Sequence, residues 1–98
     1  MKTSLEPREI RMLYERGLSF AYLVTLEDIL EQLENAEYRS QGFPMVMLTF
    51  CQTRKKWIAC FRNSKDAIEA GVDDTPLKAS FKLLINYLDW RDANGNTK

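Results

Sequence analysis

The sequence contains no histidine and only two cysteines, and both scarcities narrow the chemistry open to the chain. Without histidine it lacks the side chain best suited to proton transfer near neutral pH and the commonest partner of a serine or cysteine nucleophile. Cys51 and Cys60 lie in apolar runs without the paired spacing of a redox or zinc motif, which favours buried, reduced thiols. We therefore expect no catalytic triad, no bound metal and no cofactor.

Glycine is also scarce, and the four glycines stand alone in the sequence. No glycine-rich phosphate loop or dinucleotide-binding fingerprint is present. Asp73 and Asp74 form the one obvious pair of adjacent carboxylates, and capping of a following helix is enough to account for them. The sequence predicts that the chain is not an enzyme; a carboxylate enzyme centred on this pair is the alternative, and it would need a concave pocket around both side chains.

Long apolar runs are absent as well. No stretch approaches the roughly 18 consecutive apolar residues that span a bilayer, and the first residues lack the apolar core of a signal peptide. Hydrophobic residues make up 45% and charged residues 29% of the chain, as in ordinary globular domains. We expect one soluble, cytoplasmic domain over residues 1–98, with a frayed tail at 93–98 and no membrane contact.

Positive and negative charges balance over the whole chain but are segregated along it. Residues 42–65 contain no acid, and their basic residues are Arg54, Lys55, Lys56, Arg62 and Lys65. Positive side chains at a turn can bind phosphates, so a nucleic-acid site is one hypothesis. The other is a solvated basic turn, which helps to prevent aggregation of strands.

Two helices are predicted in the N-terminal part. Pro7 suits the first turn of a helix over residues 5–16, and Gly17 suits the position after its end. Thr25 is the predicted cap of a second helix over residues 26–40. The intervening apolar residues 18–24 are expected to be buried, as a strand or as a helical turn.

The second predicted helix has one apolar and one acidic face. Leucine, isoleucine and alanine recur every three or four positions, and glutamates occupy the opposite side. These acidic residues are Glu27, Glu31, Glu34 and Glu37. They form either a solvated face or a binding surface for a basic partner.

Residues 43–51 and 57–61 are rich in strand-forming apolar side chains and are joined by a polar segment, which predicts a β-hairpin. Neither face of the first strand is polar, so both faces are expected to be covered. The predicted fold class is α+β: a small antiparallel sheet that contains the hairpin and carries helices on both faces, as an α-β-α sandwich.

A last helix is predicted from Pro76, capped by Thr75, to about Trp90. Beside its main apolar stripe lies a second one, made of Leu83, Tyr87 and Trp90. So wide an apolar arc either packs against another layer of the same chain or binds a partner. A homodimer with its interface at or near Leu83, Tyr87 and Trp90 is one hypothesis.

Residues 57–61 (Trp-Ile-Ala-Cys-Phe) and 75–79 (Thr-Pro-Leu-Lys-Ala) carry a weak family resemblance. The order of a strand with Trp-x-Ala, a short connection and Thr-Pro-Leu-x-Ala at a helix start resembles small phage and prophage proteins with an α-β-α sandwich. It covers residues 43–90 and implies an accessory role without a catalytic residue. A similar order occurs in HicB-like antitoxins, but residues 72–75 and 78–79 depart from the antitoxin pattern.

The expected function is that of a non-enzymatic, phage-type accessory protein that binds another protein of unknown identity. The absent catalytic set, the segregated charges and the resemblance all favour this hypothesis. Nucleic-acid binding through Arg54, Lys55 and Lys56, with Arg62 and Lys65 nearby, is the alternative.

Overall fold

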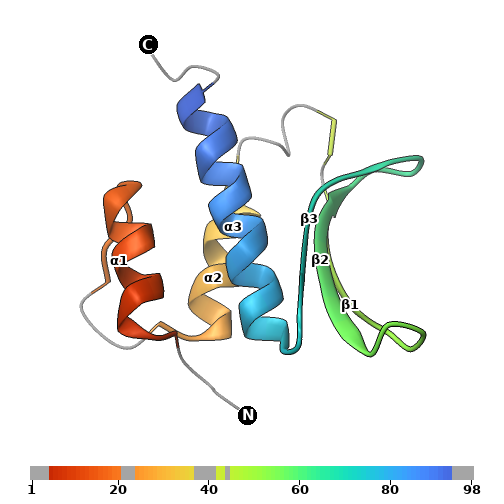
Figure 1. The fold of residues 1–98 in the computed structure, drawn as a ribbon. Coiled ribbons are helices and arrows are strands. Elements are labelled where there is room, and N and C mark those ends of the chain that lie inside the picture. The colour runs from red at the N-terminus through yellow and green to blue at the C-terminus, as the bar shows by residue number, and fades with distance from the viewer. Residues whose placement is uncertain (1–4, 21–23, 37–41, 44, 94–98) are drawn as a thin grey trace.

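A computed structural model of the chain describes residues 5–20, 24–36, 42–43 and 45–93. Its elements follow one another in the order α1 (Pro7–Glu15), α2 (Leu26–Glu34), β1 (Met45–Cys51), β2 (Lys56–Arg62), β3 (Ala67–Asp73) and α3 (Pro76–Ala93) (Figure 1). The strands form an antiparallel sheet of order β1-β2-β3. The predicted α+β class is therefore confirmed.

Capping residues fix the starts of the helices. Thr25 and Asp28 exchange hydrogen bonds in a capping box at α2, as the sequence predicts. Thr75 accepts a hydrogen bond from the backbone N–H of Lys78 at the start of α3. Helix α1 begins with Pro7 and is followed by Gly17, whose φ is 94°. The starts of all three predicted helices are thus correct to within two residues.

Helix α2 is shorter than the predicted span to residue 40. It ends at Glu34, because the N–H of Asn35 turns back to the Gln32 carbonyl and the N–H of Ala36 to the Leu33 carbonyl. The Asn35 side chain also donates to the Glu31 carbonyl, 3.0 Å away, which satisfies one of the last carbonyls of the helix. Residues 37–41 lie outside the described residues, and so does the predicted acidic position Glu37.

The connection over residues 18–24 is only partly described. Residues 18–20 and Val24 belong to neither a helix nor a strand. Val24 is fully buried as expected, whereas Leu18 and Phe20 are only half-buried and Ser19 is exposed. Residues 21–23 lie outside the described part of the chain.

The predicted hairpin is present, with β1 and β2 in continuous register from Met45 opposite Arg62 to Cys51 opposite Lys56. Strand β3 has no counterpart in the sequence prediction. Its sequence, Ala-Ile-Glu-Ala-Gly-Val-Asp, contains a glycine and two acids, residue types that are depleted in strands. An irregularity in its register against β2 further disturbs the alternation of the side chains.

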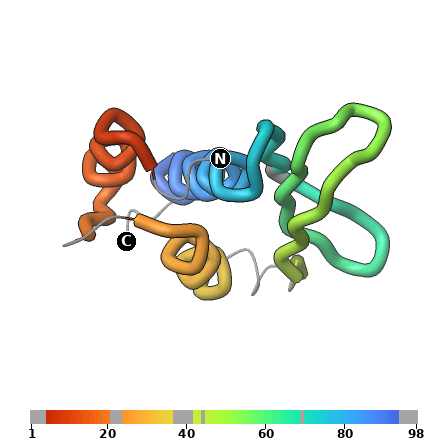
Figure 2. Tube along the Cα trace, turned by 90° about the horizontal axis from the view of Figure 1, so that it is seen from below, coloured from red at the N-terminus to blue at the C-terminus, as the bar shows by residue number. Residues whose placement is uncertain are grey.

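Helix α3 is the central element of the fold. It packs on β2 and β3 with one side, while α1 and α2 lie beside it away from the sheet (Figures 1 and 2). Every described helix thus lies on the same side of the sheet, and the predicted second helical layer is absent from the described residues. That prediction treated an apolar strand face as a buried one, whereas Met45 and Met47 keep 45% and 38% of their surface exposed.

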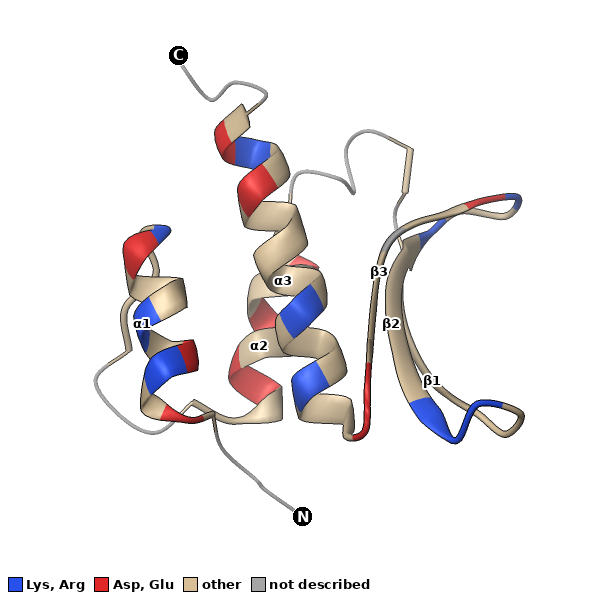
Figure 3. Ribbon diagram, in the orientation of Figure 1, with Lys and Arg blue, Asp and Glu red and all other residues tan. Residues whose placement is uncertain are grey.

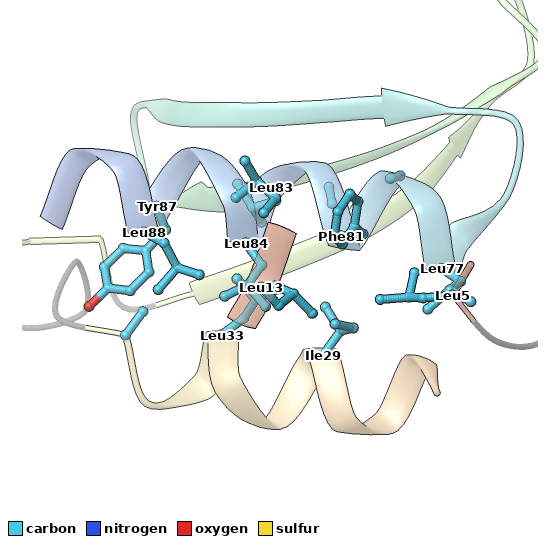
Figure 4. Packing of buried hydrophobic residues seen from close by; sticks show 14 of the residues in the cluster. Leu5, Leu13, Ile29, Leu33, Leu77, Phe81, Leu83, Leu84, Tyr87 and Leu88 are labelled. Carbon is cyan, nitrogen blue, oxygen red and sulfur yellow. The ribbon is translucent and has the colours of Figure 1, made fainter. Parts of the chain in front are cut away.

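The wide apolar arc of α3 is explained by this central position. Ile29 and Leu33 point from α2 toward α3, and Leu83 and Leu84 of α3 are fully buried (Figure 4). Tyr87 is 6% exposed and lies between the ring of Phe61, 6.0 Å away, and that of Trp90, 6.1 Å away. The structure therefore places Leu83 and Tyr87 in the core of the single chain, and Trp90 partly buried against it, rather than on a free interface.

Side-chain contacts hold α1 against both ends of α3. Near the start of α3, the ammonium group of Lys78 forms an ion pair with the carboxylate of Glu9. Near its end, Arg16 pairs with Asp89 at 2.7 Å, and Arg91 donates to the Arg16 carbonyl at 3.0 Å. These contacts order α1 along the face of α3.

Candidate protein-interaction surface

Exposed large apolar side chains gather on β1. Three of the four such residues in the described part of the chain, Met45, Met47 and Phe50, belong to this strand. Tyr14 on α1 is the fourth. Because exposed apolar clusters mark binding surfaces more often than single exposed residues do, β1 is the first candidate for a functional site.

The strand register separates the side chains of the hairpin into two faces. Val46, Leu48 and Phe50 lie opposite Phe61, Ala59 and Trp57, and together they face α3. Met45, Met47, Thr49 and Cys51 lie opposite Arg62, Cys60, Ile58 and Lys56 on the other face, which we call the outer face. The outer face thus has an apolar centre with one cation at each end.

Strand β1 extends past the helix that supports the sheet. Helix α3 contacts β2 and β3 extensively but reaches β1 only slightly. Phe50 therefore remains 39% exposed even though it belongs to the inner face, where its ring meets Trp57 edge-on at 5.5 Å. The inner face of β1 is consequently accessible at Phe50, whereas Val46 and Leu48 pack against the core.

The two cations of the outer face differ in their surroundings. Lys56 forms an ion pair with Asp74, and the hydrogen bond and charge of that carboxylate raise the pKa of Lys56. No ion pair of Arg62 is found among the described residues. The Arg62 end of the outer face is thus the better site for an acidic group of a partner.

The basic residues of the predicted nucleic-acid site do not form one patch. Arg54, Lys55 and Lys56 lie at the β1–β2 turn, whereas Arg62 and Lys65 lie at the opposite end of the sheet (Figure 3). At the usual rise of a strand, Lys56 and Arg62 are about 20 Å apart. The positive stretch of the sequence is therefore divided between two ends of the molecule.

Asp73 and Asp74 do not act as helix caps, because Thr75 takes that role. Asp73 pairs with Lys82 at 3.0 Å and accepts a hydrogen bond from the Asp74 backbone, while Asp74 itself pairs with Lys56. Burial would raise the pKa of Asp73, but the hydrogen bonds from Lys82 and Asp74 and the nearby positive charges lower it overall. The two carboxylates thus serve separate ion pairs.

Both cysteines are free thiols on the outer face, and Cys51 is only half-buried instead of buried as predicted. Cys60 is 5% exposed on the central strand, and its burial raises the pKa of the thiol despite the charge of Arg62. A raised pKa keeps the thiol protonated and weakly nucleophilic. Cys60 therefore adds little to the accessible outer face, in surface or in reactivity.

Two other surfaces, the acidic face of α2 and a groove beside α3, are weaker candidates for binding a partner. Glu27, Glu31 and Glu34 lie on the exposed face of α2 as predicted, and the half-buried Leu30 is the one apolar side chain that lines a shallow hollow with them. An open groove of about 630 Å³ lies between α1, α3 and β3, but Phe81 and Ile85 at its base are only 5% and 8% exposed. None of the exposed large apolar residues of the described chain lines that groove, whereas three of them belong to β1.

Other kinds of site were sought in the same part of the chain. Among the described residues, no group of three or more His, Cys, Asp or Glu side chains is placed to hold a metal ion. The described helices include none that is both long and apolar enough to cross a membrane. Comparisons with protein-family models, curated proteins and solved structures yield no match.

Proposed function

We propose that this chain is a non-enzymatic accessory domain that acts by binding another protein through the outer face of its sheet. The observation that carries the proposal is the exposure of Met45 and Met47 on a face that no described helix covers. Methionine suits such a surface because its flexible, polarisable side chain adapts to partners of different shape. The resemblance to phage and prophage proteins supports an accessory role and remains a prediction.

The chemistry of the outer face defines the partner segment that fits it. The half-buried Ile58 continues the apolar surface from β1 onto β2, and Arg62 ends it with a positive charge. A partner segment with apolar side chains at its centre and an acidic residue near Arg62 would match both features.

Selection from a display library of short random peptides tests the proposal. The expected result is enrichment of apolar segments that carry an acidic residue, with binding lost in a Met45→Lys, Met47→Lys double variant. Tyr14→Lys is the matched control, because it makes the same kind of change at an exposed apolar residue on α1. Failure to enrich any peptide, or equal binding by the double variant, would refute the proposal.

Nucleic-acid binding through Arg54, Lys55 and Lys56 stays a prediction with weaker support. Lys56 is engaged by Asp74, which leaves Arg54 and Lys55 as the exposed cations of the turn. If the turn binds phosphates, replacing Arg54 and Lys55 by alanine flattens the salt dependence of binding by about one unit per lost contact. An unchanged slope would exclude a role for this turn.

A further inference from the structure

The two edges of the sheet are built differently. Strand β3 forms one edge, and its register against β2 is interrupted between Ala59 and Phe61. Side chains of α3 also reach its backbone: Lys82 donates to the Val72 carbonyl at 3.2 Å and Asn86 to the Ala70 carbonyl at 3.5 Å. An irregular edge whose carbonyls are already engaged resists the addition of another strand.

Strand β1 forms the opposite edge, where none of these protections is found among the residues that the structure describes. From Met45 to Cys51 it contains no charged residue and no proline, and its register against β2 runs without interruption. An edge strand leaves alternate N–H and C=O groups facing outward, ready to pair with a further strand. A long, regular and uncharged edge is therefore the kind that another chain extends.

We infer that two copies of this chain associate by antiparallel pairing of β1 with β1 of the second copy. A two-fold axis through the middle of the strand places Leu48 opposite Leu48 of the second copy and Val46 opposite Phe50. A β-branched residue opposite an aromatic one is a stabilising cross-strand pair. The pairing also covers Phe50, which is 39% exposed in the single chain.

The character of β1 favours a second copy over an unrelated strand. Antiparallel pairing of a strand with itself sets each residue opposite its mirror position and only the central residue opposite itself; β1 has no charge that would have to be accommodated at either kind of position. The chain as a whole has a formal net charge of zero, so two copies approach without net repulsion. Each copy contributes its complete sheet, and the interface is isologous as a closed dimer requires.

This inference goes beyond the proposed function, because it uses the backbone edge of β1 rather than the side chains of the outer face. Edge pairing brings the outer faces of the two copies side by side, with Met47 beside Thr49 of the second copy. The dimer would therefore offer a partner one continuous apolar surface about twice as wide.

Sedimentation equilibrium and site-specific crosslinking test the inference. The expected mass is twice the 11.5 kDa of the chain. In a Cys51→Ser, Cys60→Ala background, Leu48→Cys is expected to form a disulfide-linked dimer on mild oxidation. Ser64→Cys is the control, because it places a single thiol in the exposed turn between β2 and β3.

A second crosslinking pair covers the case in which Leu48→Cys does not fold. Met47→Cys and Thr49→Cys, each alone in the same background, change exposed outer-face residues, and the mixture is expected to give more linked dimer than either protein alone. A chain that stays monomeric at high concentration, or equal crosslinking through Ser64→Cys, overturns the inference. A monomer that still selects peptides through Met45 and Met47 would overturn it while leaving the proposed function intact.

Discussion

Gly71 of β3 lies directly against the backbone of α3 at Ala79. A Cβ atom on Gly71 would stand 2.3 Å from the Ala79 carbonyl oxygen and 2.7 Å from the Leu83 nitrogen, both far inside van der Waals contact. The glycine is thus required by the close approach of strand and helix rather than by its backbone angles. It sets the distance between the sheet and its supporting helix.

The first prediction follows from this contact. Gly71→Ala should lower the free energy of unfolding by about 3 kcal/mol, because backbone atoms cannot move aside as a flexible side chain would. Gly42→Ala is the matched control: it meets nothing within 4 Å but has a φ of 95°, so it should cost only about 1 kcal/mol. Urea unfolding of both variants measures the difference. A smaller loss for Gly71→Ala than for Gly42→Ala would contradict the prediction.

The second prediction concerns the ion pair of Lys78 and Glu9 between α3 and α1. Their side chains are only 18% and 10% exposed, so removing the cation leaves a poorly solvated carboxylate. Lys78→Ala should therefore lower the free energy of unfolding by about 2 kcal/mol. In a Glu9→Gln background the same substitution should cost much less, because the buried carboxylate is gone and only the more exposed Glu6, 3.9 Å from the Lys78 ammonium, loses a cation. Additive losses in this double-mutant cycle would show that the pair contributes nothing.

Local signals in the sequence predicted the helices well because the residues that start each helix and form its buried face lie in the helix or directly before it. Thr25 and Thr75 act as caps, Pro76 starts α3, and the apolar spacing of α2 gives its buried face. Strand β3 could not be recognised in the same way. Gly71 is required only because the strand approaches Ala79 closely, and Ala79 lies later in the chain.

The candidate surfaces depended on tertiary contacts that no local pattern records. The same apolar character accompanies burial in Leu83 and exposure in Met47, because α3 lies between two layers while no described helix covers the outer face of the sheet. The sequence alone therefore predicts an interface at the end of α3 and helices on both faces of the sheet. Strand β1 is apolar on both faces although it lies at the edge of the sheet. This combination indicates a binding surface only once the strand order is known.

The third prediction is a dependence of stability on pH that arises from Asp73. Its pKa is lowered in the folded chain, so unfolding raises the pKa toward its ordinary value near about 4. The resulting stabilisation is fully present above that value and is lost as the pH falls through the lower pKa of the folded state. Urea midpoints at neutral and strongly acidic pH should therefore differ less in Asp73→Asn than in the wild type. An identical acid-induced drop in both proteins would show that Asp73 is not responsible.

The fourth prediction concerns Ser80, which is fully buried on α3 and whose hydroxyl has no hydrogen-bond partner in the described structure. Burying an unpaired hydroxyl costs free energy, and alanine fills nearly the same space while favouring the helix. Ser80→Ala should therefore raise the free energy of unfolding by about 1 kcal/mol. Ser64→Ala, in the exposed turn after β2, removes an equivalent hydroxyl from solvent contact and should leave the urea midpoint unchanged. A loss of stability in Ser80→Ala would contradict the prediction. It would show that the hydroxyl forms a hydrogen bond within the core.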